Sequence, residues 1–112
     1  MEVLMEPKFN SWIENNGEVV ISLWRADLLQ AISASRSLKK AADEMKIPFK
    51  DAQEKLQEME RGLGVKLLTT PSGEIEKGDV SLTSEGEDLL KKFKEFSAGI
   101  EAEIDDRFKK SF

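Results

Sequence analysis

The first regular pattern along the chain is a pair of apolar segments around a turn signal. Phe9, Trp12 and Ile13 precede the turn sequence Asn-Asn-Gly at 15–17, and the apolar run 19–21 (Val-Val-Ile) follows it. Asn-Gly supplies the positive φ angles that a tight hairpin turn requires, and β-branched residues favour strands. Residues 8–22 are therefore predicted to form a β-hairpin.

From about residue 23 the apolar residues follow the three-and-four spacing of helices. Leu28, Leu29 and Ile32 mark a first helix, which small polar residues interrupt at 33–37. Ser37 is a suitable N-cap for a second helix. A third helix is predicted to begin near Pro48, where the missing N–H costs nothing, and to end at Gly62 or Gly64. Its buried positions are expected to be Ala52, Leu56, Met59 and Leu63.

A second hairpin and a long final helix complete the pattern. Residues 65–70 and 79–82 alternate as strands on either side of a polar tip that begins with Pro-Ser-Gly at 71–73. Thr83 or Ser84 is expected to cap the last helix, with Glu87 as the capping-box partner of Ser84. At about 1.5 Å per residue that helix runs to roughly 40 Å, which is longer than a domain of this size can cover. Its apolar stripe comprises Leu89, Leu90, Phe93, Phe96, Ile100, Ile104 and Phe108.

The order of elements and three sequence words resemble the N-terminal winged-helix domain of LysR-type regulators and of the molybdate-responsive regulator ModE. The words are SLKKAA at 37–42, MERGLGVKLL at 59–68 and LTSEGEDLL at 82–90. The segment WIENNGEVV at 12–20 looks more like the short ModE-type proteins. The resemblance covers about residues 8–97, and this chain ends without the molybdate-binding domains that follow the winged helix in ModE.

The resemblance implies an α+β fold, mainly α: a winged helix-turn-helix with an N-terminal β-hairpin and a long C-terminal dimerisation helix. The expected division places the winged-helix domain at 1–82 and the dimerisation helix at 83–112. Within the domain, the hairpin would occupy about 8–22, the helix-turn-helix about 25–64 and the wing about 65–82.

Composition excludes several classes of function. The 112 residues include no cysteine and no histidine, so disulfides, thiolate metal sites and the Ser-His-Asp triad are absent. The acids at the end of the chain are interleaved with basic residues, which is typical of a solvated helix. We therefore expect no enzyme activity, no metal site and no cofactor. The longest apolar run has three residues and the N-terminus is acidic, so we expect a cytoplasmic protein with no membrane partner.

The net charge of −5 is unevenly distributed. Residues 25–46 carry +2 and residues 47–70 are neutral, whereas the wing at 71–82 carries −2. The basic residues therefore lie around the start of the second helix, where a helix-turn-helix meets phosphates. Three positions depart from the pattern of the related families: Arg36 replaces the usual glycine, the wing tip is acidic, and no arginine stands at the aligned outward positions of the third helix. Its outward positions are expected to be Gln53, Glu54, Gln57 and Glu58. The acidic wing and the third helix oppose DNA contact.

The preferred function is a homodimeric transcriptional regulator that binds duplex DNA. Phosphate contacts would come from the second helix and its approach, and base contacts from the third helix, where glutamine can pair with adenine and Glu54 can accept from cytosine. The expected DNA-binding residues are Arg36, Ser37, Lys39, Lys40, Phe49, Lys50, Gln53, Gln57 and Lys77. The expected dimer contacts are Leu89, Phe93, Phe96, Ile100 and Ile104.

An alternative belongs to another class of function. The acidic third helix and wing are also typical of a winged helix that docks on a basic protein partner and does not read DNA. A continuous positive face across the two third helices of a dimer would favour DNA, and a negative face would favour the docking module.

Overall fold

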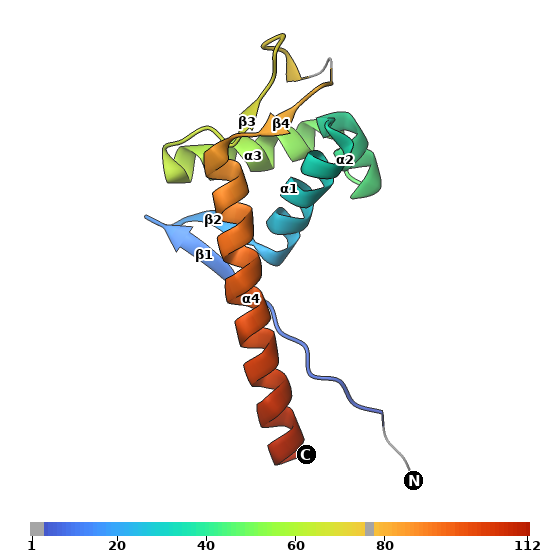
Figure 1. Ribbon diagram of the computed structural model, residues 1–112, viewed down its shortest axis with the longest axis vertical. Helices are drawn as coiled ribbons and strands as arrows, with labels where there is room; N and C mark the ends of the chain where they lie inside the picture. The colour runs from blue at the N-terminus through green and yellow to red at the C-terminus, as the bar shows by residue number, and fades with distance from the viewer. Residues whose placement is uncertain (1–3, 76–77) are drawn as a thin grey trace.

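The computed structural model describes residues 4–75 and 78–112 of the chain. Two small antiparallel sheets flank three short helices, and a long helix runs along the assembly and beyond it (Figure 1). This arrangement confirms the mainly helical α+β class. The elements in chain order are β1 (Trp12–Asn15), β2 (Glu18–Ser22), α1 (Leu23–Ser35), α2 (Leu38–Glu44), α3 (Phe49–Leu63), β3 (Leu68–Thr69), β4 (Ser81–Leu82) and α4 (Ser84–Ser111).

The N-terminal hairpin forms as its turn sequence predicts. Asn16 and Gly17 both have positive φ angles, of 53° and 81°, which match the right-handed twist of the paired strands. β1 is exposed along its whole length, whereas β2 buries Val20 and Ile21. The hairpin is therefore attached to the domain through β2, which packs against α3.

Local capping fixes where the three short helices begin and end. Ser37 Oγ accepts a hydrogen bond from the amide of Lys40 at 3.1 Å, which confirms Ser37 as the N-cap of α2. Pro48 occupies the N-cap position of α3, and Gly64 ends that helix in the left-handed conformation at φ 71°. Arg36 ends α1 in the same conformation at φ 57°, although it is not a glycine.

The core lies between α1, α2, α3 and the start of α4. Among the described residues it contains no buried polar or charged side chain. Its fully buried large side chains are Ile21, Leu28, Leu29, Ile32, Leu38, Met59, Leu67 and Val80.

The wing strands are shorter than the alternation at 65–70 and 79–82 predicts. β3 and β4 have two residues each, and they pair Leu68 with Leu82. The residues just outside this pairing use their amides elsewhere: Leu67 donates to the carboxylate of Glu60 at 2.8 Å, and Val80 donates to the carbonyl of Arg36 at 2.9 Å. These amides are therefore not available to lengthen the hairpin, that of Leu67 at the end next to α4 and that of Val80 at the end next to the tip.

Helix α4 begins one residue earlier than a Ser84 cap would place it. Thr83 Oγ1 accepts from the amide of Gly86 at 3.1 Å, so Thr83 is the cap and the predicted capping box between Ser84 and Glu87 does not form. The 28 residues of α4 span about 42 Å. The helix extends well past the other elements, as predicted (Figure 1). In the described part of the chain, no helix is long and apolar enough to cross a membrane.

Candidate nucleic-acid interface

The amino end of α2 presents a group of cations to solvent. Lys39 and Lys40 are both exposed, and Lys39 makes only a loose 3.7 Å contact with Asp43. Together with Arg36 and Ser37, these lysines line an open hollow that the end of the wing closes on one side. The structure thus brings together four residues that the sequence assigned to phosphate contact.

Arg36 connects this hollow to the wing. Its guanidinium donates to the carboxylate of Asp79 at 2.9 Å, and its carbonyl accepts from the amide of Val80. Both side chains of the ion pair are more than half exposed, so solvent screens their attraction. Arg36 therefore both positions the returning strand of the wing and contributes a cation at the edge of the hollow.

One row of α3 points away from the core. Lys50, Glu54, Gln57 and Arg61 are exposed at spacings of four, three and four, which places them along a single face. Gln53 is half-buried beside this row, where it lines a groove between α3 and the wing. Phe49 packs against the core, so its ring is only partly available to a ligand.

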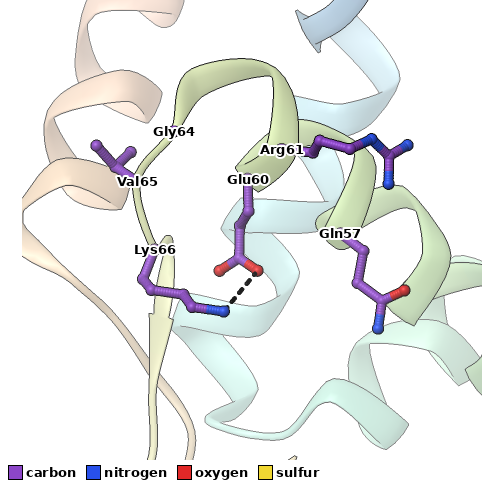
Figure 2. Close-up of a pocket in the computed structure, with 6 residues that line it drawn as sticks. All are labelled: Gln57, Glu60, Arg61, Gly64, Val65 and Lys66. Carbon is purple, nitrogen blue, oxygen red and sulfur yellow. Dashed lines mark ion pairs between the residues drawn. The ribbon is translucent and has the colours of Figure 1, made fainter.

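Two acids of α3 turn away from this face. Glu58 was expected among the outward positions, but it is half-buried and pairs with Arg25 at 2.8 Å and with Lys55 at 3.9 Å. Glu60 accepts from the amide of Leu67 and lies 3.9 Å from the ammonium of Lys66. Figure 2 shows that ion pair beside Gln57, Arg61, Gly64 and Val65, which line a shallow pocket at the end of the helix. Only Glu54 remains as an acid within the outward row.

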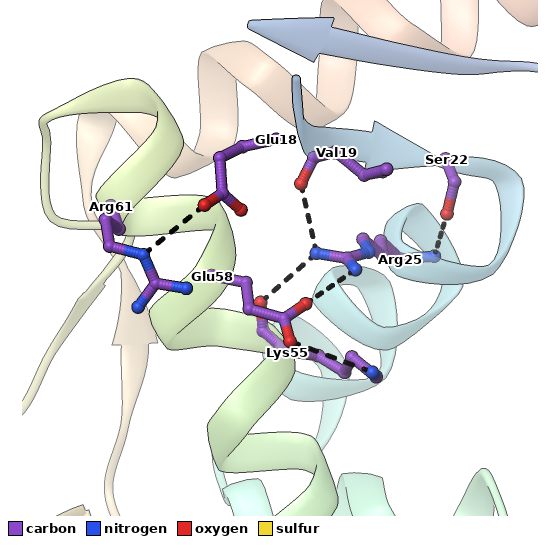
Figure 3. Close-up of polar contacts among 7 residues, drawn as sticks. All are labelled: Glu18, Val19, Ser22, Arg25, Lys55, Glu58 and Arg61. Carbon is purple, nitrogen blue, oxygen red and sulfur yellow. Dashed lines mark hydrogen bonds and ion pairs between the residues drawn. The ribbon is translucent and has the colours of Figure 1, made fainter. Parts of the chain in front are cut away.

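Arg25 fixes the rear of α3 to the hairpin. Its guanidinium donates to the carbonyl of Val19 at 3.1 Å, to the carbonyl of Lys55 at 3.5 Å and to the carboxylate of Glu58 at 2.8 Å (Figure 3). The side chain is 12% exposed. The sequence analysis counted Arg25 in the basic segment 25–46 that was expected to meet phosphates, whereas the structure uses this charge inside the domain.

A second contact between hairpin and α3 explains one glycine of the MERGLGVKLL word. Asn15 donates its side-chain amide to the carbonyl of Gly62 at 2.7 Å. A β-carbon on Gly62 would lie 2.7 Å from Cγ1 of Val20, so this residue must be small for β2 to approach. The more exposed pair between Arg61 and Glu18, at 3.7 Å, lies on the same side (Figure 3). The N-terminal hairpin is thus a support that holds α3 from behind.

The wing offers few groups to a polyanion. Thr70 is half-buried and Ser72 is exposed, and their hydroxyl groups lie 3.3 Å apart. Lys77, the cation that the sequence assigned to the wing, lies outside the described residues.

The apolar stripe of α4 divides into a covered part and an open part. Phe93 is 2% exposed within a single chain and Leu89 packs against the core, because the first turns of α4 lie on α1 and β4. Phe96 is 47% exposed, and Ile100 and Ile104 are half-exposed farther along. Of the predicted dimer contacts, those available to a second copy therefore begin at Phe96.

The described residues hold no group of three or more acidic, histidine or cysteine side chains placed to bind a metal ion. The acids at the end of α4 pair instead with nearby cations of the same helix, Glu103 with Arg107 and Asp106 with Lys110, both at 2.8 Å.

Comparison with known proteins identifies the fold. No protein-family model and no curated protein matches the sequence. The BenM DNA-binding domain, in its crystal structure with benA site 1 DNA, matches at a TM-score of 0.64 and 21% identity over 81% of this chain and all of that one. The fold is a winged helix-turn-helix. The complex of the same domain with catB site 1 DNA matches with a TM-score of 0.61 and 21% sequence identity. The match covers 80% of this chain and 93% of that chain.

A full-length BenM mutant matches at a TM-score of 0.64 and 21% identity over 82% of this chain, which corresponds to 28% of that protein. BenM is a LysR-type regulator, so the resemblance to the LysR-type winged helix is confirmed for the fold. The closer resemblance of segment 12–20 to ModE stays a prediction from the sequence.

Proposed function

We propose that this chain binds duplex DNA as a homodimer and regulates transcription. The observation that carries the proposal is the position of α3, which projects an exposed row of hydrogen-bonding side chains beside the lysines of α2. In a winged helix-turn-helix this helix enters the major groove, which is wide enough to admit it. The BenM domains of the same fold were crystallised with DNA.

The two groups of side chains would have different tasks. Arg36, Ser37, Lys39 and Lys40 lie where the helix-turn-helix meets the sugar-phosphate backbone, and such contacts set affinity and register without reading sequence. The outward part of α3 would read base edges through Lys50, Gln53 and Gln57, with Phe49 anchoring the start of the helix in the core.

Dimerisation is supported by the open part of the α4 stripe. Phe96 is exposed and Ile100 and Ile104 are partly exposed in a single chain, and Phe108 continues the same spacing. Pairing of two α4 helices would cover these residues and give a twofold dimer, which suits a palindromic site with half-sites about 34 Å apart. An Ile100→Glu substitution places a charge in that contact and should yield a monomer in sedimentation velocity.

The decisive test is selection of bound duplexes from a randomised library, followed by affinity measurements from low to physiological salt. Replacing Lys39 and Lys40 by alanine should weaken binding to all sequences alike and reduce the salt dependence. The matched control replaces Lys91 and Lys92 by alanine, since these lysines of α4 carry the same charge far from α2. An unchanged salt slope in the first variant would remove the phosphate role.

A second candidate function is docking on a basic protein partner. The net charge of −5 and the acidic residues of the wing favour it, because both repel a polyanion. A folded dimer that binds no duplex even at low salt would overturn the first proposal and favour this alternative.

A further inference from the structure

Glu54 is the one acid that α3 keeps in its outward row. Its side chain is exposed, and the described residues provide it with no hydrogen bond or ion pair. In contrast, Glu58 pairs with Arg25 and Lys55. Glu60 pairs with Lys66 and accepts a hydrogen bond from a main-chain amide. If α3 met only phosphates, an unpaired carboxylate in its centre would oppose binding. We infer that the Glu54 carboxylate contacts a group other than phosphate.

The position of Glu54 within the row suggests what that is. Lys50 and Arg61 lie at the two ends of the row, about 16 Å apart along the helix axis, and Glu54 and Gln57 lie between them. The major groove is about 12 Å wide between its two phosphate backbones. The outer cations are therefore spaced to reach the backbones, Arg61 by exchanging its exposed 3.7 Å contact with Glu18 for a phosphate. The two inner side chains then face the floor of the groove, where there is no phosphate.

A carboxylate at the floor of the major groove needs a donor, and the amino groups there are cytosine N4 and adenine N6. Adenine places the acceptor N7 beside N6, and guanine presents two acceptors, all of which repel a carboxylate. Cytosine is therefore the better partner. We propose that Glu54 is a specificity-determining residue that accepts a hydrogen bond from cytosine N4. This proposal rests on the proposed DNA-binding function and names the base pair that the site prefers.

The neighbouring side chain extends the expected half-site. Gln57 lies about 4.5 Å farther along α3, a distance close to the 3.4 Å step between base pairs. Glutamine pairs through two hydrogen bonds with adenine N6 and N7. The half-site is therefore expected to carry a C·G pair read by Glu54 beside or one step from an A·T pair read by Gln57.

The test compares the wild-type chain, Glu54→Gln and Asp51→Asn in library selection and in affinity for the selected site. Asp51→Asn is the matched control, because it removes one negative charge from the first turn of α3 outside the outward row. We expect Glu54→Gln to lose the preference for C·G at one position per half-site and to bind the wild-type site about tenfold more weakly. Asp51→Asn should keep the wild-type consensus.

The outcomes separate this proposal from the function on which it rests. If Glu54→Gln keeps the consensus and binds every duplex more tightly, Glu54 only repels DNA, and the specificity role is wrong while DNA binding stands. If the folded wild-type dimer selects no sequence at all, the proposed function fails and the role of Glu54 fails with it. Circular dichroism checks that the variants are folded, and the exposed positions of both acids make them suitable for substitution.

Discussion

Gly86 lies in the first turn of α4, where the helix rests on the backbone of the wing. A β-carbon at this position would lie 2.6 Å from the carbonyl oxygen of Leu67 and 3.3 Å from Cβ of Leu82. That carbonyl accepts the amide of Thr83 at 2.9 Å, so it cannot move away without weakening the start of α4. Gly86→Ala is therefore expected to destabilise the fold, although alanine is the better helix former.

The magnitude follows from two opposing effects. An extra methyl group forced into a packed site costs about 1–3 kcal/mol. The higher helix propensity of alanine offsets at most about 1 kcal/mol of this, and less in a first turn. The expected loss in the free energy of unfolding for Gly86→Ala is about 1–2 kcal/mol, which lowers Tm by roughly 4–8 °C in a chain of this length.

The same helix supplies a matched control in Gly99. A β-carbon added at Gly99 would have no heavy atom within 4 Å. Gly99→Ala should therefore raise the free energy of unfolding by up to about 1 kcal/mol from helix propensity alone. Denaturant unfolding followed by circular dichroism, with all chains at one concentration, measures both effects. If Gly86→Ala matches or exceeds the stability of the wild type, the first turn has room for a side chain and the reasoning is refuted.

Two further substitutions probe the support of α3 and the turn after α2. Arg25→Met should cost about 2–3 kcal/mol in chemical denaturation, because among the described residues Glu58 keeps only Lys55 at 3.9 Å and the carbonyls of Val19 and Lys55 lose this donor. Arg61→Met removes only an exposed pair and should cost less than about 0.5 kcal/mol. Equal losses would contradict the internal role of Arg25. Lys46 has φ 60° and an exposed side chain, a backbone conformation that strains any residue except glycine. Lys46→Gly should therefore raise the free energy of unfolding by roughly 0.5–1 kcal/mol, while Lys91→Gly inside α4 should lower it by about 1 kcal/mol. A loss of stability in Lys46→Gly would refute the strain argument.

The elements that the sequence predicted well are those whose signals are local. The Asn-Gly turn, the Ser37 cap and the Gly64 terminus each depend on the conformation or hydrogen bonding of a few adjacent residues. The long stripe of α4 was likewise readable from spacing. Local chemistry of this kind is present in the sequence itself, so the order of helices and hairpins could be predicted before the structure.

The features that the sequence did not predict depend on partners far along the chain. Arg25 and Glu58 are 33 residues apart, and nothing in their own neighbourhoods shows that they pair. The short wing strands have the same origin, because Glu60 and Arg36 take up the amides that would have extended them. The glycines at 62 and 86 were visible as motif positions, but their reason is a close approach between elements that only the fold brings together.

These distant pairings also change what the net charge means for DNA. The sequence places four acids and four bases in residues 47–70, which suggests a neutral helix unable to attract phosphate. The fold pairs Glu58 with Arg25 and Glu60 with Lys66, and it leaves Lys50 exposed without an ion pair among the described residues. Arg61 is exposed and makes only a 3.7 Å contact with Glu18. The overall charge of −5 would still weaken contact with arbitrary sequences. If the chain binds DNA as proposed, its affinity comes chiefly from base contacts of the outward row on α3. Weak non-specific binding and a sharp sequence preference are then expected together.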